Sequence, residues 1–124
     1  MKIKRVKIGI KGQKESLEDF RRAAKAIERG EKPKKSRGVY FENLDTFRRA
    51  LTAKRLEMLH AIKESRPSSV YELAKTLDRD IKNVTQDLEY LSDIGLVEMK
   101  RTRDKRERIT PEVNYDKIDL EIAV

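Results

Sequence analysis

Three consecutive apolar patterns of helical spacing occupy residues 52–95, and they constrain the fold more than any other feature of the chain. Apolar residues spaced by three and four are typical of a helix that buries one face. Thr52, Ser69 and Asp80 are residue types that cap helix N-termini, and Gly95 is the type that ends a helix. The residues expected to face inward are Leu56, Leu59 and Ile62, then Val70, Leu73, Ala74 and Leu77, then Ile81, Val84, Leu88 and Leu91.

The connections between these helices are short. The second helix spans about eight residues and the turn after it about three, as the tight crossing of a helix-turn-helix requires. Gly95 is followed at once by the β-forming pair Leu96-Val97, a charged tip at 101–106 and a return strand from Glu107. Three helices and a hairpin in this order predict an α+β fold with a winged helix-turn-helix.

The two ends of the chain add further elements. Residues 2–10 alternate between apolar and polar, which is typical of a half-buried strand. A helix is expected from Ser16 to Gly30, followed by a charged linker, a short strand at 38–42, a short helix, and a final strand near 117–123. We therefore expect an N-terminal strand-helix extension with its linker at 1–37, for dimerisation or partner binding, and a winged helix-turn-helix domain at 38–124.

Composition argues against several classes of protein. The chain has no cysteine and one histidine, His60, so it cannot build a His/Cys metal site or a Cys–His nucleophile pair. Its five glycines are scattered and form no phosphate-binding loop. No apolar run reaches the length of a membrane span, and the N-terminus is too charged for a signal peptide. We expect a cytoplasmic protein that is not an enzyme and has no cofactor, metal or membrane contact.

The net charge of +8 comes from the N-terminal third of the chain. Residues 1–42 carry 14 basic and 6 acidic side chains, whereas the remainder is balanced. Such an excess suits a polyanion or an acidic protein partner. It equally suits a solvated surface that keeps the protein soluble.

The helical segments resemble the MarR-like winged-helix regulators, and more closely an archaeal branch of predicted DNA-binding proteins. The resemblance covers roughly residues 39–122 and is carried by four stretches: Leu51 to Leu59, Val70 to Leu77, Arg79 to Leu88, and Leu91 to Val97. It implies a sequence-specific regulator of transcription that binds double-stranded DNA. A helix at 80–94 would read the major groove, and a basic wing at 98–109 would lie along the backbone or in the minor groove.

The polar edge of the third helix suits base reading. Helical geometry turns Lys82, Asn83 and Gln86 outward, and these side chains can pair with guanine or adenine in the major groove. Arg79 and Thr85, on the flank, are predicted to contact the DNA backbone. The alternative is an ordinary amphipathic helix with a solvated face.

The hairpin supplies the predicted backbone contacts. Between positions 100 and 108 six basic side chains face two acidic ones. Such cations add affinity and orientation without choosing a sequence. The predicted contacts are Lys100, Arg101, Arg103, Lys105, Arg106 and Arg108. The alternative is that these charges only keep an exposed strand edge from pairing.

We expect a homodimer, because relatives of this kind bind pseudo-palindromes as symmetric pairs. The apolar faces available for it are Val6, Ile8 and Ile10, then Leu17, Phe20 and Ile27, then Ile118, Leu120 and Ile122. Two other functions remain open. The chain could be the antitoxin of a toxin–antitoxin pair, with its basic N-terminal part on a protein toxin, or a general RNA or nucleoid binder.

Overall fold

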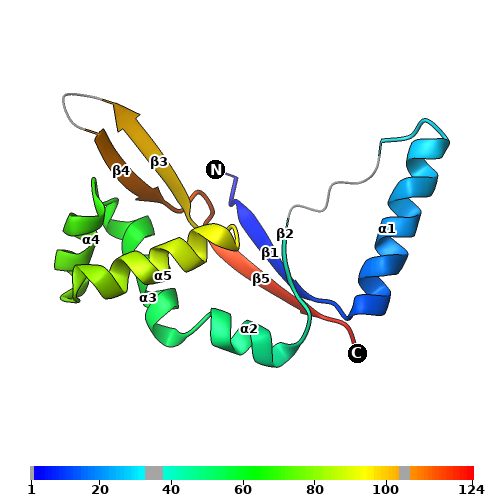
Figure 1. Cartoon of the computed structure of the whole chain (residues 1–124), viewed down its shortest axis with the longest axis horizontal. Coiled ribbons are helices and arrows are strands. Elements are labelled where there is room, and N and C mark those ends of the chain that lie inside the picture. Colours follow the sequence, from blue (N-terminus) through cyan, green and yellow to red (C-terminus); the bar gives the residue numbers. More distant parts are fainter. Residues whose placement is uncertain (1, 33–37, 104–106) are drawn as a thin grey trace. The chain divides into compact units, whose positions relative to one another are not determined.

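The computed structural model describes residues 2–32, 38–103 and 107–124. It is an α+β fold, as predicted, with helices and strands in the order β1-α1-β2-α2-α3-α4-α5-β3-β4-β5 (Figure 1). The chain divides into two compact units. One comprises residues 1–4 and 51–116, and the other comprises residues 5–50 and 117–124. No helix among the described residues is long and apolar enough to cross a membrane.

The second unit is built on a three-stranded parallel sheet. Its strands are β1 (Arg5–Ile10), β2 (Gly38–Phe41) and β5 (Lys117–Ile122), in the order β2-β1-β5. Both β2 and β5 run parallel to β1, so the central strand joins segments from opposite ends of the chain. The predicted division at residue 37 therefore differs from that of the structure. Backbone hydrogen bonding places β2 and β5 with the N-terminal strand rather than with the three-helix segment.

The two faces of this sheet differ in character. Ile8 lies opposite Val39 on one side and Leu120 on the other, so one face is apolar. The helix α2 (Leu44–Ala50) supplies Phe47, whose ring meets that of Phe41 edge-on at 5.7 Å. The opposite face carries the ion pairs Arg5–Asp119 at 3.2 Å and Lys7–Glu121 at 2.8 Å.

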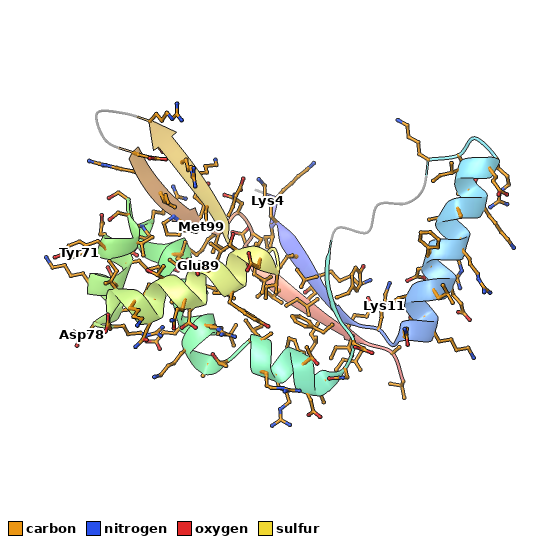
Figure 2. The ribbon with its side chains drawn as sticks, in the orientation of Figure 1. Lys4, Lys11, Tyr71, Asp78, Glu89 and Met99 are labelled. Atoms are coloured by element: carbon orange, nitrogen blue, oxygen red, sulfur yellow. The ribbon has the colours of Figure 1, made fainter. Side chains whose placement is uncertain are left out.

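The long helix α1 (Gln13–Glu28) joins β1 to β2 and has no buried residue. It begins at Gln13, three residues before the predicted start, because Gly12 rather than Ser16 occupies the N-cap position. Lys11 ties it to the sheet: its ammonium lies 2.6 Å from the Asp19 carboxylate and 4.3 Å from the centre of the Tyr40 ring (Figure 2). This ion pair holds the pKa of Lys11 above its usual value.

The first unit contains three helices and an antiparallel hairpin. They are α3 (Ala53–Ser65), α4 (Val70–Leu77), α5 (Ile81–Asp93), β3 (Glu98–Arg103) and β4 (Glu107–Glu112). The predicted N-caps are confirmed, since the side chains of Thr52, Ser69 and Asp80 each accept a hydrogen bond from a backbone N–H of the first turn. The buried core of this unit is Met58, Leu59, Ile62, Leu73, Ala74, Val84, Leu88, Leu91, Leu96 and Val97.

Two residues expected to face inward are exposed. Leu56 and Ile81 each keep 46% of their accessible surface. On α3, Met58 is buried and Leu56 is not. Arg55, next to Leu56 in the sequence, contacts Asp87 and Tyr90 of α5. Ile81 opens α5 immediately after the cap, where no preceding turn covers it.

The connection from α5 to the hairpin also differs slightly from the prediction. The expected strand begins at Leu96, whereas β3 begins at Glu98. Leu96 and Val97 are buried, and both of their N–H groups donate to the carbonyl of Leu91. The apolar pair thus closes the end of α5 before the chain enters the sheet.

Candidate nucleic-acid interface

The position of α5 is fixed by its cap, its apolar face and its end. Oδ1 of Asp80 accepts a hydrogen bond from the N–H of Lys82 at 2.9 Å, which satisfies one of the open donors of the first turn. Val84, Leu88 and Leu91 are buried at the spacing of one helix face. Gly95 has a φ of 88°, a left-handed conformation that glycine adopts without steric cost. The helix is therefore anchored along its whole inner side.

The three predicted base-reading residues lie on the outer side of this helix. Lys82, Asn83 and Gln86 are all exposed, whereas Val84 between them is fully buried. Positions 82 and 86 are one helical turn apart, so their side chains lie on one edge. The structure thus brings together an ammonium and two amides within the first two turns of α5. Glu89, farther along α5, is also exposed (Figure 2).

An ion-pair cluster flanks this edge. Asp87 accepts hydrogen bonds from Nε of Arg55 at 3.1 Å and from Nη2 of Arg79 at 2.8 Å. The guanidinium of Arg55 also lies 4.1 Å from the centre of the Tyr90 ring. Burial alone would raise the pKa of Asp87, but the hydrogen bonds from Arg79 and Arg55 outweigh it and hold that pKa below its usual value. Two cations therefore surround the Asp87 carboxylate beside the polar edge of α5.

Two residues predicted to contact the DNA backbone have partners within the protein. The guanidinium of Arg79 is held by Asp87, and its Nη1 atom is buried with no hydrogen-bond partner among the described residues. The hydroxyl of Thr85 donates to the carbonyl of Ile81 at 2.7 Å, a bond within the helix. Arg79 and Thr85 thus have structural partners that their sequence neighbourhood does not indicate. Asp87 lies next to the apolar face of α5, and an acidic residue at such a position is a signal to look for partly buried arginine partners.

The hairpin holds some of its cations in ion pairs. Lys100 lies 3.1 Å from Glu112, and the hydrogen bond to that carboxylate raises the pKa of Lys100. Arg101 lies 3.7 Å from Glu107 across the two strands. Arg103 and Arg108 are exposed. Lys105 and Arg106 lie outside the described residues.

The base of the hairpin is tied to the loop between α3 and α4. The hydroxyl of Thr110 donates to the carbonyl of Ser68 at 2.9 Å. Ser68 in turn donates from its hydroxyl and its N–H to Glu72, and these bonds, aided by the charge of Arg108, hold the pKa of Glu72 below its usual value. The N-cap of α4 thus resembles a capping box in which Ser69 accepts from the N–H of Glu72, while the Glu72 carboxylate reaches back to Ser68 rather than to Ser69.

The residues predicted for a dimer interface fall into two groups. Ile8 is fully buried within its own unit beneath the sheet face, so it is not available to a second copy, and Val6, Ile10 and Ile118 are half-buried. The remaining residues are open to solvent. They are Leu17, Phe20 and Ile27 on α1, with 51%, 71% and 63% of their surfaces exposed, and Leu120 and Ile122 on β5.

Candidate metal ligands are not gathered in the part of the chain that the structure describes. No group of three or more histidine, aspartate or glutamate residues is placed to hold a metal ion there. His60 is exposed on α3.

The model of the HVO_A0114 family matches residues 50–120, which is more than half of the chain. The chain belongs to this family. The HVO_A0114 match begins at the end of α2, covers all three helices and the hairpin of the first unit, and reaches into β5. The candidate interface on α5 and the hairpin therefore lies entirely within the HVO_A0114 segment, whereas β1 and α1 precede it. A comparison with curated proteins gives no match.

Proposed function

We propose that this protein is a sequence-specific regulator of transcription that binds double-stranded DNA through a winged helix-turn-helix. In this proposal α5 enters the major groove, and the hairpin is the wing. The observation that carries the proposal is the polar edge of α5. Lys82, Asn83 and Gln86 are exposed in its first two turns while the opposite side of the helix is core. Lysine pairs with guanine, and asparagine or glutamine pairs with adenine in two hydrogen bonds.

The charges around α5 support this docking. A helix that approaches phosphates must limit its own negative charge. The Asp80 carboxylate caps the helix, and Asp87 is paired with both Arg55 and Arg79. The acidic side chains closest in sequence to the polar edge are thus already compensated within the protein.

The wing would supply sequence-independent affinity. Arg103 and Arg108 are exposed cations on adjacent strands of the hairpin. Arginine at such a position binds phosphates or enters a narrow minor groove, where the potential is most negative. Lys100 and Arg101 would act from within their ion pairs with Glu112 and Glu107, exchanging a carboxylate for a phosphate.

The experiment that tests the proposal is selection of bound sites from a random duplex pool, with the full chain. We expect a short enriched motif repeated with two-fold symmetry. The double variant Lys82→Ala with Gln86→Ala should lose selectivity for that motif, because each good base contact discriminates by about 1–3 kcal/mol. Lys25→Ala with Gln13→Ala on α1 is the matched control, since it removes the same side-chain types from another exposed helix.

Two results would contradict the proposal. One is a selected pool without an enriched motif, which points to a general nucleic-acid binder. The other is unchanged selectivity in the α5 double variant. Competition between a duplex DNA and an RNA duplex of the same sequence distinguishes the RNA-binding alternative, which predicts preference for RNA.

The predicted homodimer belongs to the same proposal. The exposed apolar residues of α1, Leu17, Phe20 and Ile27, recur at spacings of three and seven, which places them on one side of the helix. Sedimentation equilibrium at micromolar concentration should give twice the chain mass of 14.5 kDa. Phe20→Glu should return the protein to that chain mass, whereas Glu18→Gln, an exposed residue on another side of α1, should not.

The same exposed helix face favours a second candidate function, the antitoxin of a toxin–antitoxin pair. An apolar stripe in the part of the chain that carries the whole charge excess would suit an acidic protein partner. Coexpression with the products of the adjacent genes tests this. A stable complex of fixed stoichiometry that Phe20→Glu abolishes would favour the antitoxin, and a chain that purifies alone as a dimer would favour the autonomous regulator.

A further inference from the structure

Ile81 is an apolar residue that lies exposed beside the polar edge of α5. It opens the helix directly after the Asp80 cap and keeps 46% of its surface accessible, although its spacing from Val84 predicts an inward position. A single exposed aliphatic residue is ordinary on a protein surface. This one adjoins Lys82 in the first turn, and the N-terminal residues of a recognition helix are the ones that contact base edges.

Folding alone gives little reason for an isoleucine at this position. A β-branched side chain forms helices less well than alanine or lysine. Because almost half of its surface stays in contact with water, Ile81 gains only part of the free energy that full burial of an isoleucine provides. The fold thus leaves part of an apolar side chain uncovered at the border of the proposed interface.

Thr85 adds a second apolar group on the same flank of α5. It lies one helical turn after Ile81, and its hydroxyl donates to the Ile81 carbonyl at 2.7 Å. That hydroxyl has no proton left for a phosphate oxygen, which leaves the methyl group of Thr85 for an apolar contact. Ile81 and Thr85 therefore form a short apolar strip along one side of the polar edge.

We propose that Ile81, with the methyl group of Thr85, contacts the C5-methyl group of a thymine in the major groove. This inference rests on the proposed function and adds a specificity-determining residue to the same interface. The C5-methyl group is the apolar feature that thymine presents in the major groove, and apolar side chains recognise it. Asn83 and Gln86 can pair with adenine, so the neighbouring side chains favour A·T pairs within reach of the strip.

Replacement of thymine by deoxyuridine tests this contact, because it removes the C5-methyl group and keeps every hydrogen bond of the base pair. Each thymine of the selected duplex is replaced in turn, and the affinity of the full chain is measured by fluorescence anisotropy at one salt concentration. We expect a thymine within the motif at which the replacement weakens binding about fourfold, the effect of exposing one buried methyl group. Replacement outside the motif should change affinity little.

Variants at position 81 assign the effect to Ile81. Ile81→Ala should weaken binding to the thymine duplex and abolish the difference between thymine and deoxyuridine, because the side chain that meets the methyl group is gone. Ile81→Val, which is shorter by one methylene, should keep part of that difference. Leu44→Ala is the matched control, since Leu44 opens α2 of the other unit directly after Asn43, has 47% of its surface exposed, and should leave the difference intact.

The contact would be overturned by a selected motif without thymine, by a motif in which no thymine methyl group affects affinity, or by a difference that persists undiminished in Ile81→Ala. Each of these results leaves the proposed function standing, because a specific motif is still bound. A pool without an enriched motif would instead contradict the proposed function, and this contact together with it.

Discussion

Arg79 donates from Nη2 to Oδ2 of Asp87 over 2.8 Å, and thereby ties the turn before α5 to the middle of that helix. The other carboxylate oxygen accepts from Arg55 of α3. A single aspartate thus joins three segments of the first unit, α3, the α4–α5 turn and α5. Because the polar edge of α5 depends on the orientation of this helix, Asp87 is a positioning residue for the candidate interface.

Asp87→Asn should destabilise the protein by about 1–3 kcal/mol, because two partly buried guanidinium groups lose their charged acceptor. Urea unfolding at pH 7 measures this change. Asp93→Asn, an exposed residue at the end of the same helix, is the control and should change the free energy of unfolding little. Equal effects of the two substitutions would contradict the role assigned to the cluster.

The same cluster predicts a pH dependence. The pKa of Asp87 is lowered in the folded state, so its contribution to stability is present above the unfolded pKa of about 3.9 and is lost as the pH falls through the lower, folded value. Between pH 5 and pH 3 the wild type should therefore lose more stability than Asp87→Asn. Parallel curves for the two proteins would be inconsistent with a paired, ionised Asp87.

Gly95→Ala should cost about 1–2 kcal/mol, because its φ of 88° brings an added Cβ close to the backbone. Gly95→Asn is the matched substitution, since asparagine adopts left-handed conformations more readily, and it should cost less. Thermal unfolding of the three proteins gives the order glycine, asparagine, alanine from most to least stable. If alanine were as stable as asparagine, the left-handed turn would not be what selects glycine between α5 and the hairpin.

Tyr115 also stabilises the connection between α5 and the hairpin. Its hydroxyl donates to the carbonyl of Leu96 at 2.9 Å, and burial raises the pKa of Tyr115 to about 12. Tyr115→Phe should lose about 1 kcal/mol of stability, the usual net value of one hydrogen bond. Tyr71→Phe, on an exposed ring of α4, is the control and should be neutral.

The raised pKa of Tyr115 also predicts how stability changes with pH. The neutral phenol is favoured in the folded state, so its contribution is present below pH 10 and is lost as the pH rises from the unfolded pKa of about 10 toward the folded value. Ultraviolet absorbance of tyrosinate, followed against pH, should show a late rise near pH 12 in the wild type that Tyr115→Phe lacks. A wild type in which all four tyrosines titrate together would contradict the burial of this hydroxyl.

The three helices were predictable because their signals are local. Thr52, Ser69 and Asp80 each bond to a donor two or three residues away, so cap identity alone locates the start of each helix. Gly95 marks the end of α5 for a similarly local reason. The outward placement of Lys82, Asn83 and Gln86 followed from the apolar period of the same helix, and their exposure confirms that part of the prediction.

What the sequence did not indicate depends on contacts between distant segments. The pairing of β1 with β5 joins residues 5–10 to residues 117–122. An alternating pattern predicts a strand but does not indicate which other strand it pairs with. This pairing is why the division of the chain differs from the predicted one at residue 37. The engagement of Arg79 by Asp87 is likewise set by the crossing of α4 and α5, so a cation expected to face DNA has a partner within the protein.

A substitution in the hairpin should separate affinity for DNA from selectivity among DNA sequences. Arg103 is an exposed cation at the end of β3, and in the proposed complex it neutralises a phosphate. Arg103→Ala should weaken binding to all duplexes alike. It should also make the plot of log affinity against log salt concentration shallower by about 0.9, the value for one contact on B-form DNA.

Fluorescence anisotropy with the selected duplex and a scrambled one, at several salt concentrations, measures both quantities. Arg22→Ala on α1 is the control, because it removes an exposed arginine from the other unit and leaves every residue of the hairpin unchanged. A loss confined to the selected duplex would make Arg103 a base-reading residue instead. A slope equal to that of the wild type would remove it from the interface, since an arginine that displaces no counterion contacts no phosphate.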